Sequence, residues 1–211
     1  MKLKYALILM IFPLILQAQH HSAGFKMGLF DPSATDAGFI IGYEGSKYID
    51  DRFDIGWSVD WFNKNYVDKN LVSEFNSAFG IPDGTINELR AKTNIHSIPL
   101  MGTATAHLFQ RDKVSLYVTA GVGLDVLLIF YKNYENPRDD ELKGAFDFCW
   151  RLGTGVTYEL GYRSEIFGEL AYHHSEPSWT YEVTDEGRTR TFERVFDMSG
   201  IMARIGFRFY Y

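Results

Sequence analysis

The chain is poor in cysteine, and Cys149 is its single thiol, so it cannot form an internal disulfide. A chain with one thiol must be stabilised by hydrogen bonds and packing instead. Basic residues are also few, because 21 lysines and arginines face 27 acidic residues, giving a formal net charge of -6. This balance argues against a nucleic-acid partner, which would require clustered positive charge.

Long apolar runs are scarce as well, and a mean hydropathy of -0.16 excludes a bundle of membrane-spanning helices. One internal run, residues 114–130, could be read as a membrane helix. A helix would scatter the polar residues of this run around its circumference, whereas a strand places them on one face. They share one parity, which predicts a strand: Ser115, Thr119, Gly121, Gly123 and Asp125.

The first residues have the three parts of a secretory signal. Lys2 and Lys4 precede an apolar run at residues 6–16, and Gln17 and Ala18 follow it. The apolar run is too short to span a bilayer as a helix. We therefore expect a signal peptide over residues 1–18, cleaved after Ala18, and a mature domain over residues 19–211. No lipoprotein anchor is expected, because no cysteine stands directly after the cleavage site.

Eight segments of the mature chain alternate apolar and polar residues, each about as long as a tilted strand that crosses a bilayer. The clearest is the third, in which Phe53, Trp57 and Trp61 share one parity, and Asp54 and Asp60 share the other. Aromatics at 16% and 19 glycines suit many half-buried strands with tight bends. The predicted strands cover about residues 24–30, 38–45, 53–61, 95–108, 114–130, 146–159, 166–174 and 200–211.

The connections between these segments alternate in length. Short turns are predicted near residues 45–52, 110–113 and 161–165, and long loops near residues 63–94, 132–144 and 175–198. Short periplasmic turns and long extracellular loops are typical of outer-membrane barrels; the short loop at residues 31–36 is the exception. In the first long loop, Leu71, Phe75 and Phe79 recur at helical spacing, which predicts a short amphipathic helix.

The two parities of the strands predict two different faces. Aromatic residues gather near both ends of the outward parity, as expected of the two membrane interfaces: Phe39, Tyr43, Phe53, Trp61, Phe130, Phe146, Tyr158 and Tyr172. The inward parity carries a predicted polar network of the lumen: Lys26, Glu44, Asp54, Asp60, Asp125, Arg151, Glu159, Glu169, Arg204 and Arg208. Unpaired charges in a narrow lumen are costly, so Arg204 or Arg208 is expected to pair with Glu169.

The final strand ends in aromatic residues at alternate positions, Phe207, Phe209 and Tyr211. This ending resembles the assembly signal of bacterial outer-membrane β-barrels. The whole mature chain resembles the small eight-stranded barrels of the OmpA/OmpX type and the outer-membrane β-barrel family of Bacteroidetes-like bacteria, in which segments such as 97–100 (SIPL) and 120–124 (AGVGL) recur.

That resemblance implies an all-β fold, namely an eight-stranded antiparallel up-and-down transmembrane barrel. It also implies a place in the outer membrane of a Gram-negative bacterium, contact with lipid, and recognition of the C-terminal strand by the barrel-assembly machinery. No cofactor is expected. A soluble lipocalin-like barrel is the architectural rival, but lipocalins enclose their apolar parity around a ligand.

Three functions remain open at this point. The favoured one is a structural or surface-binding barrel that contacts an extracellular ligand or protein through its loops. A narrow pore for small solutes is an alternative, although eight strands leave room only for side chains. A lipid A-modifying hydrolase is another, because His173 and Ser175 resemble the His-x-Ser element of outer-membrane deacylases, with Glu182 or Glu186 as a possible orienting group.

Two possible chemical sites have simpler interpretations. The deacylase serine must meet lipid, yet Ser175 shares the inward parity of Glu169, and the simpler interpretation is a polar strand end that enters a loop. His21 would be the third residue after cleavage, a spacing at which a free amino terminus and an imidazole can bind Cu(II). A disordered arm is the simpler interpretation there, so no metal site is predicted.

Overall fold

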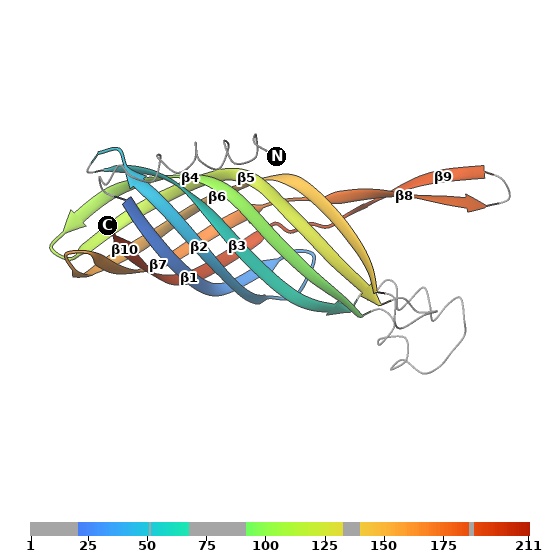
Figure 1. Ribbon diagram of the computed structural model, residues 1–211, viewed down its shortest axis with the longest axis horizontal. Coiled ribbons are helices and arrows are strands. Elements are labelled where there is room, and N and C mark those ends of the chain that lie inside the picture. Colours follow the sequence, from blue (N-terminus) through green and yellow to red (C-terminus); the bar gives the residue numbers. More distant parts are fainter. Residues whose placement is uncertain (1–20, 51, 68–91, 133–139, 186–187) are drawn as a thin grey trace, which may run out of the picture.

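The computed structural model describes residues 21–50, 52–67, 92–132, 140–185 and 188–211. They form ten strands (Figure 1): β1 (His21–Pro32), β2 (Gly38–Tyr48), β3 (Phe53–Val67), β4 (Lys92–Arg111), β5 (Val114–Lys132), β6 (Asp140–Gly161), β7 (Ser164–His174), β8 (Ser178–Asp185), β9 (Arg188–Val195) and β10 (Gly200–Tyr210). Among these residues, no helix is long and apolar enough to cross a membrane.

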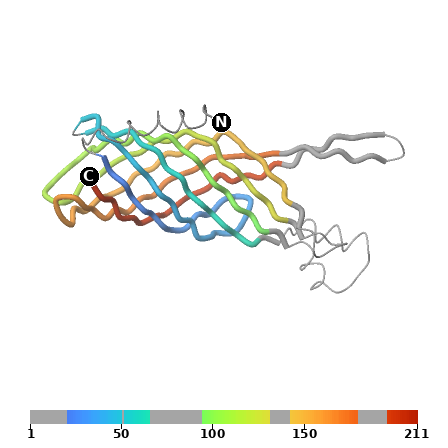
Figure 2. Tube along the Cα trace, viewed as in Figure 1, coloured from blue at the N-terminus to red at the C-terminus, as the bar shows by residue number. Residues whose placement is uncertain are grey.

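Eight of the strands close into an antiparallel barrel, in the order β1-β10-β7-β6-β5-β4-β3-β2. The last strand pairs with the first, from Ser22 opposite Tyr210 to Pro32 opposite Gly200. Strands β8 and β9 form a separate two-stranded sheet, which projects from one end of the barrel in Figure 1. Figure 2 shows the path of the barrel strands in the same view. The predicted eight-stranded antiparallel barrel is confirmed.

The prediction was wrong about the extent of several strands. β3 continues to Val67, and β4 and β6 begin at Lys92 and Asp140, so two predicted loops are partly strand. The loop predicted at residues 175–198 contains the β8–β9 hairpin. The amphipathic helix predicted around Leu71 and Phe75 lies outside the described residues.

The barrel has two distinct ends. At the turn end, β2–β3, β4–β5 and β6–β7 are joined by short connections, and β10 finishes beside the start of β1. In the β4–β5 turn, Asp112 adopts a φ of 52°, as tight hairpin turns require. At the loop end lie the other connections, including the β8–β9 hairpin (Figure 1).

The outward face of the barrel is apolar. The predicted aromatic positions are exposed there, up to 76% for Phe146, except Phe130, which is partly buried against His96 at a ring separation of 5.3 Å. Phe207, Phe209 and Tyr211 are exposed on the same face. A continuous apolar exterior around a charged interior is the reverse of a soluble ligand-binding barrel and fits a lipid environment.

The interior near the loop end is apolar, whereas the charges on the inward parity predicted a polar lumen. A buried cluster, here called the apolar plug, fills it: Phe30, Ile40, Phe62, Ile95, Leu127, Ile129, Ala145, Phe196, Met198 and Met202. The rings of Phe30 and Phe62 meet edge to face at 5.2 Å. The inward parity is therefore polar only over the rest of the barrel.

Two members of the apolar plug come from the segment between β9 and β10, which folds back over the barrel. The Phe196 amide donates to the Pro177 carbonyl, and the Met198 amide donates to the Ser175 carbonyl, both at 2.9 Å. On its other side, this segment accepts a hydrogen bond from the Ala34 amide at 2.8 Å, through the carbonyl of Asp197. Backbone hydrogen bonds thus hold the plug in the mouth of the barrel.

Substitution of Phe62 by alanine tests the contribution of the plug. Because Phe62 is fully buried, the change should leave a cavity and lower the free energy of unfolding by about 3–5 kcal/mol. Phe146→Ala is the matched control, since that ring lies on the outward face and its loss creates no cavity. Denaturant titration in micelles measures both; equal losses would contradict a packed plug.

Candidate functional site

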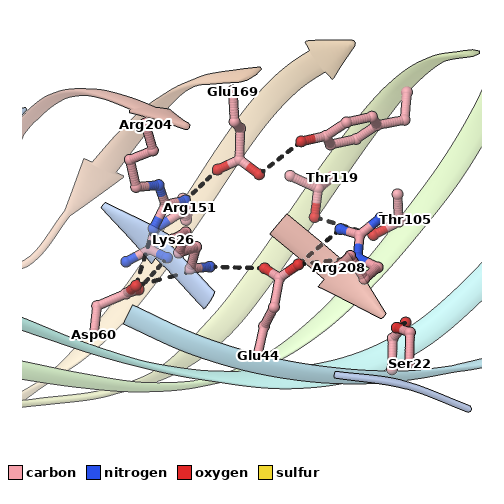
Figure 3. Close-up of polar contacts among 12 residues, drawn as sticks. Ser22, Lys26, Glu44, Asp60, Thr105, Thr119, Arg151, Glu169, Arg204 and Arg208 are labelled. Atoms are coloured by element: carbon pink, nitrogen blue, oxygen red, sulfur yellow. Dashed lines mark hydrogen bonds and ion pairs between the residues drawn. The ribbon is translucent and has the colours of Figure 1, made fainter. Parts of the chain in front are cut away.

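The central group of the barrel interior is the carboxylate of Asp60 on β3, whose side chain is fully buried. Arg151 donates to it at 2.6 Å and Arg204 at 3.1 Å, while the Lys26 ammonium lies 3.7 Å away. Figure 3 shows these three cations, from β6, β10 and β1, converging on Asp60. One acid thus ties together four strands around the barrel.

Glu169 lies beside this group and forms a second ion pair with Arg204. Its carboxylate accepts a hydrogen bond from Arg204 and a second one, at 3.2 Å, from the Tyr117 hydroxyl. Of the two arginines expected near Glu169, the structure pairs Arg204 with it. The register of β7 and β10 sets Arg204 opposite Glu169. Arg208, four residues further along β10, lies closer to the turn end and is opposite Glu165 instead.

A second group of ion pairs surrounds Arg208. Its guanidinium donates to Glu44 at 2.7 Å and to Glu165 at 2.5 Å, and it lies 4.8 Å from the centre of the Phe167 ring. Lys26 joins the two groups, because its ammonium also donates to Glu44 at 3.0 Å (Figure 3). Glu165 was missed from the sequence, since it was assigned to a turn, whereas β7 begins at Ser164.

The two groups together contain equal numbers of positive and negative side chains. Each acid has at least one cationic partner within 4 Å, so the desolvation of these charges is offset by pairing. A cavity of about 30 Å³ remains beside them, which has room for no more than a few water molecules. We call this set the central network: Lys26, Arg151, Arg204 and Arg208 with Glu44, Asp60, Glu165 and Glu169.

Three predicted lumen acids lie outside the central network. Asp125, fully buried, accepts from the Ser97 hydroxyl at 2.9 Å and lies 3.7 Å from His173. Asp54 lies 3.0 Å from the ring nitrogen of His107, and the Glu159 carboxylate lies near the turn end, 3.5 Å from the Gln110 amide. The nearest polar partner of each acid is thus a serine hydroxyl, a histidine or an amide, and none of the three pairs with an arginine or lysine among the described residues.

The two residues of the hydrolase hypothesis face the barrel interior. His173 and Ser175 are both 0% exposed, and neither side chain forms a hydrogen bond to another described residue. The ring of His173 packs edge to face on Phe30 of the apolar plug at 5.9 Å. Glu186 lies outside the described residues. This geometry keeps the Ser175 hydroxyl away from the outward face, where a lipid substrate would lie.

No metal centre is evident in the described part of the chain, which contains no group of three or more His, Cys, Asp or Glu side chains able to hold a metal ion. The hypothetical copper site would need residues 19 and 20, which lie outside the described residues. The ring of His21 stacks on that of Tyr211 at 6.1 Å, at the junction of β1 and β10.

The close packing around Asp60 depends on a glycine. A Cβ at Gly42 of β2 would lie 1.9 Å from Asp60 Oδ1 and 3.0 Å from Lys26 Cε. Asp60 cannot retreat easily, because its short side chain is buried and held by three cations. Gly155 on β6 likewise makes room for a neighbouring side chain, because the Tyr117 ring occupies the space that a Cβ would need.

Gly42→Ala should therefore push the Asp60 carboxylate out of its contacts and leave buried arginines without their partner. We expect the free energy of unfolding to fall by about 3 kcal/mol or more. Gly168→Ala is the control, because a Cβ there meets nothing within 4 Å, and its effect should stay within about 1 kcal/mol. Thermal unfolding in micelles measures both, and a benign Gly42→Ala would refute the central role of Asp60.

Comparison with known proteins places this architecture. No family model matches the sequence, and no curated protein matches it. Among solved structures, OprG of Pseudomonas aeruginosa is 14% identical with a TM-score of 0.60, and the match covers 92% of this chain and 96% of that one. A major outer membrane protein of Thermus thermophilus is 12% identical with a TM-score of 0.61, covering 91% and 98%.

Neisserial surface protein A is also similar, at 12% identity and a TM-score of 0.52, covering 91% of this chain and 96% of that chain. Identities this low establish the fold and carry no information about a ligand. The closed antiparallel barrel, its apolar exterior and these matches agree. The chain has the fold of the small eight-stranded outer-membrane β-barrels.

Proposed function

We propose that this protein is an integral outer-membrane barrel with a closed lumen, acting as a structural or surface-binding protein through its extracellular loops. In this proposal the turn end faces the periplasm and the loop end faces the outside of a Gram-negative cell, as the loop lengths favour. The apolar outward face contacts lipid, with Phe39, Trp61 and Phe146 near the outer interface and Tyr43, Phe53 and Tyr158 near the inner one.

The filled interior is the observation that carries the proposal. The apolar plug occupies the loop end, and the central network occupies the middle of the barrel with a cavity of only about 30 Å³. Eight strands leave an interior just wide enough for side chains, so paired charges and packed apolar groups use the cross-section that solutes would need. A function in bulk transport is disfavoured for this reason.

The surface-binding part of the proposal is supported by the β8–β9 hairpin. It projects beyond the loop end of the barrel (Figure 1) and pairs with no barrel strand in the described chain. Its two strands are held together by their own register, from Ser178 opposite Val195 to Asp185 opposite Arg188. A partner outside the cell would meet this hairpin before it met the barrel wall.

Export and assembly complete the proposal. The signal at residues 1–18 would deliver the chain to the periplasm, where the barrel-assembly machinery would recognise the final strand. Phe207, Phe209 and Tyr211 suit this recognition, because they lie exposed on one face of β10 or just beyond it. Closure of β10 onto β1 would then satisfy the last open strand edges in the bilayer.

A narrow pore for small solutes is the second candidate, and one observation favours it. An open cavity of about 1080 Å³ lies at the turn end and reaches inward to Glu165 and Tyr210. Solutes could enter the barrel from that end, but the central network and the plug lie beyond it. The hydrolase hypothesis has no comparable support, because Ser175 is buried inside.

Conductance in planar bilayers separates these functions. The unmodified protein should show no large, stable channels, because ion pairs and the apolar plug fill the lumen. Glu169→Ala removes one of the two carboxylate partners of Arg204, and it should destabilise the barrel by about 3 kcal/mol and produce brief leakage events. Steady porin-like conductance of the unmodified protein would refute the closed lumen and favour the pore.

Substitution of the C-terminal aromatics tests the proposed localisation. Replacing both Phe209 and Tyr211 by alanine should lower the amount of protein in the outer membrane, because the assembly machinery would lose the rings that it recognises. The packing of the folded barrel should change little, since both rings are exposed on the outward face. The precursor should still be exported and processed. Quantitative immunoblots of membrane and periplasmic fractions measure this; unchanged abundance, or release of the intact protein without detergent, would contradict the proposal.

A further inference from the structure

A vestibule opens at the turn end of the barrel, with a volume of about 1080 Å³. It is separate from the surface-binding loops, which lie at the other end. Its walls come from β2, β4, β5, β6, β7 and β10, and the side chains that matter for its chemistry are Tyr48, His107, Ser115, Glu159, Glu165 and Tyr210. Glu165 is also the member of the central network nearest this cavity, and Arg208 lies immediately behind it.

Two glutamates face each other across the wall of this vestibule. Glu159 on β6 and Glu165 on β7 are directly opposite in the register of the two strands. Like charges at such positions destabilise a sheet unless they are compensated. Arg208 compensates Glu165 at 2.5 Å, but no cation among the described residues lies within 4 Å of Glu159, which has only the Gln110 amide at 3.5 Å.

A buried hydroxyl beside Glu159 also has no partner. Ser115 is 8% exposed, lines the vestibule, and its Oγ forms no hydrogen bond to any described residue. It lies opposite Thr157 in the β5–β6 register, two residues from Glu159 on the same inward face. A lone serine hydroxyl can accept a hydrogen bond from a donor placed between it and the glutamate.

Aromatic rings form another part of the wall. The ring of Tyr48 stacks on that of His107 at 5.4 Å and lies 6.0 Å from that of Tyr210, and the two tyrosine hydroxyls are 3.3 Å apart. Tyrosine ring faces attract organic cations, and tyrosine hydroxyl oxygens accept hydrogen bonds from ammonium groups. The vestibule therefore offers both an anionic and an aromatic surface.

The remaining described charges near the mouth form no ion pair with Glu159. The Lys113 carbonyl accepts the Glu159 amide at 2.8 Å, but the two side chains do not pair within 4 Å. Asp50 accepts the backbone amides of Arg52 and Phe53, at 2.7 and 2.8 Å, and Asp54 lies against His107. Arg163 lines the mouth with an exposed side chain, outside 4 Å of any described carboxylate. Acidic groups thus outnumber basic ones on the vestibule wall.

We propose that the vestibule binds an organic ammonium ion, a primary amine with an aliphatic body, with its charged group at Glu159 and Ser115. The carboxylate and the free hydroxyl supply acceptors for the N–H groups, and Tyr48 and Tyr210 cover the carbon chain. A bare metal ion suits the site less well, because the cavity is far larger than an ion and the described residues supply no set of three metal-binding side chains.

Spermidine is a suitable probe, titrated by calorimetry into the full-length protein in uncharged micelles. It should bind saturably and raise the unfolding temperature, since a ligand that binds the folded state stabilises it. Glu159→Gln should weaken binding about tenfold or more, because a charge-assisted hydrogen bond is lost. The same variant should fold well and be at least as stable without spermidine, because it removes the facing negative charge.

Asp36→Asn is the matched control, since it removes the same charge from an exposed position at the loop end, and its affinity for spermidine should equal that of the unmodified protein. The neutral 1,4-butanediol should not bind. Equal weakening by Asp36→Asn and Glu159→Gln would mean that only overall charge attracts spermidine, and would overturn the proposal. Undetectable spermidine binding, or Mg²⁺ binding tighter than spermidine, would overturn it as well.

Discussion

The pairing of β10 with β1 is the interaction on which the rest of the molecule depends. Backbone N–H and C=O groups facing hydrocarbon must find partners within the protein, so a membrane-crossing sheet has to close on itself. The register from Ser22–Tyr210 to Pro32–Gly200 provides this closure. Once the sheet is closed, alternate side chains are forced inward, and an eight-stranded ring gives them very little room. The polar groups of the interior are therefore obliged to satisfy one another.

The central network is the consequence of that confinement. A charge enclosed by strands on all sides has lost its hydration, and only pairing offsets the loss. Asp60 meets cations from three other strands, and Lys26 carries the connection onward to Glu44 and Arg208. Such contacts join strands that are not neighbours in the sheet. The same residues that block the lumen thus also brace the barrel across its interior, and closure and stability have a common origin.

Alternation in the sequence was enough to predict all eight barrel strands and the inward or outward direction of most side chains, because lipid and lumen impose opposite demands on the two parities. It could not predict which charges meet. Parity places Arg204 and Arg208 inside, but their partners depend on the stagger of β7 against β10, and hence on a strand start at Ser164. The predicted polar network of the lumen also left out inward apolar residues such as Phe30 and Met202, which only the folded barrel gathers with Phe196 into a plug.

The interior is asymmetric along the barrel axis, and this asymmetry bears on function. At the loop end, packed apolar side chains and the hydrogen-bonded segment before β10 seal the mouth. At the turn end, the barrel stays open as far as Arg208 and its carboxylate partners. In the proposed orientation, molecules outside the cell meet only the exterior of the loops, whereas periplasmic solutes reach polar and aromatic groups inside the wall. Because the central network separates the two, recognition at one end does not require passage through the barrel, and each end is free to bind a different class of partner.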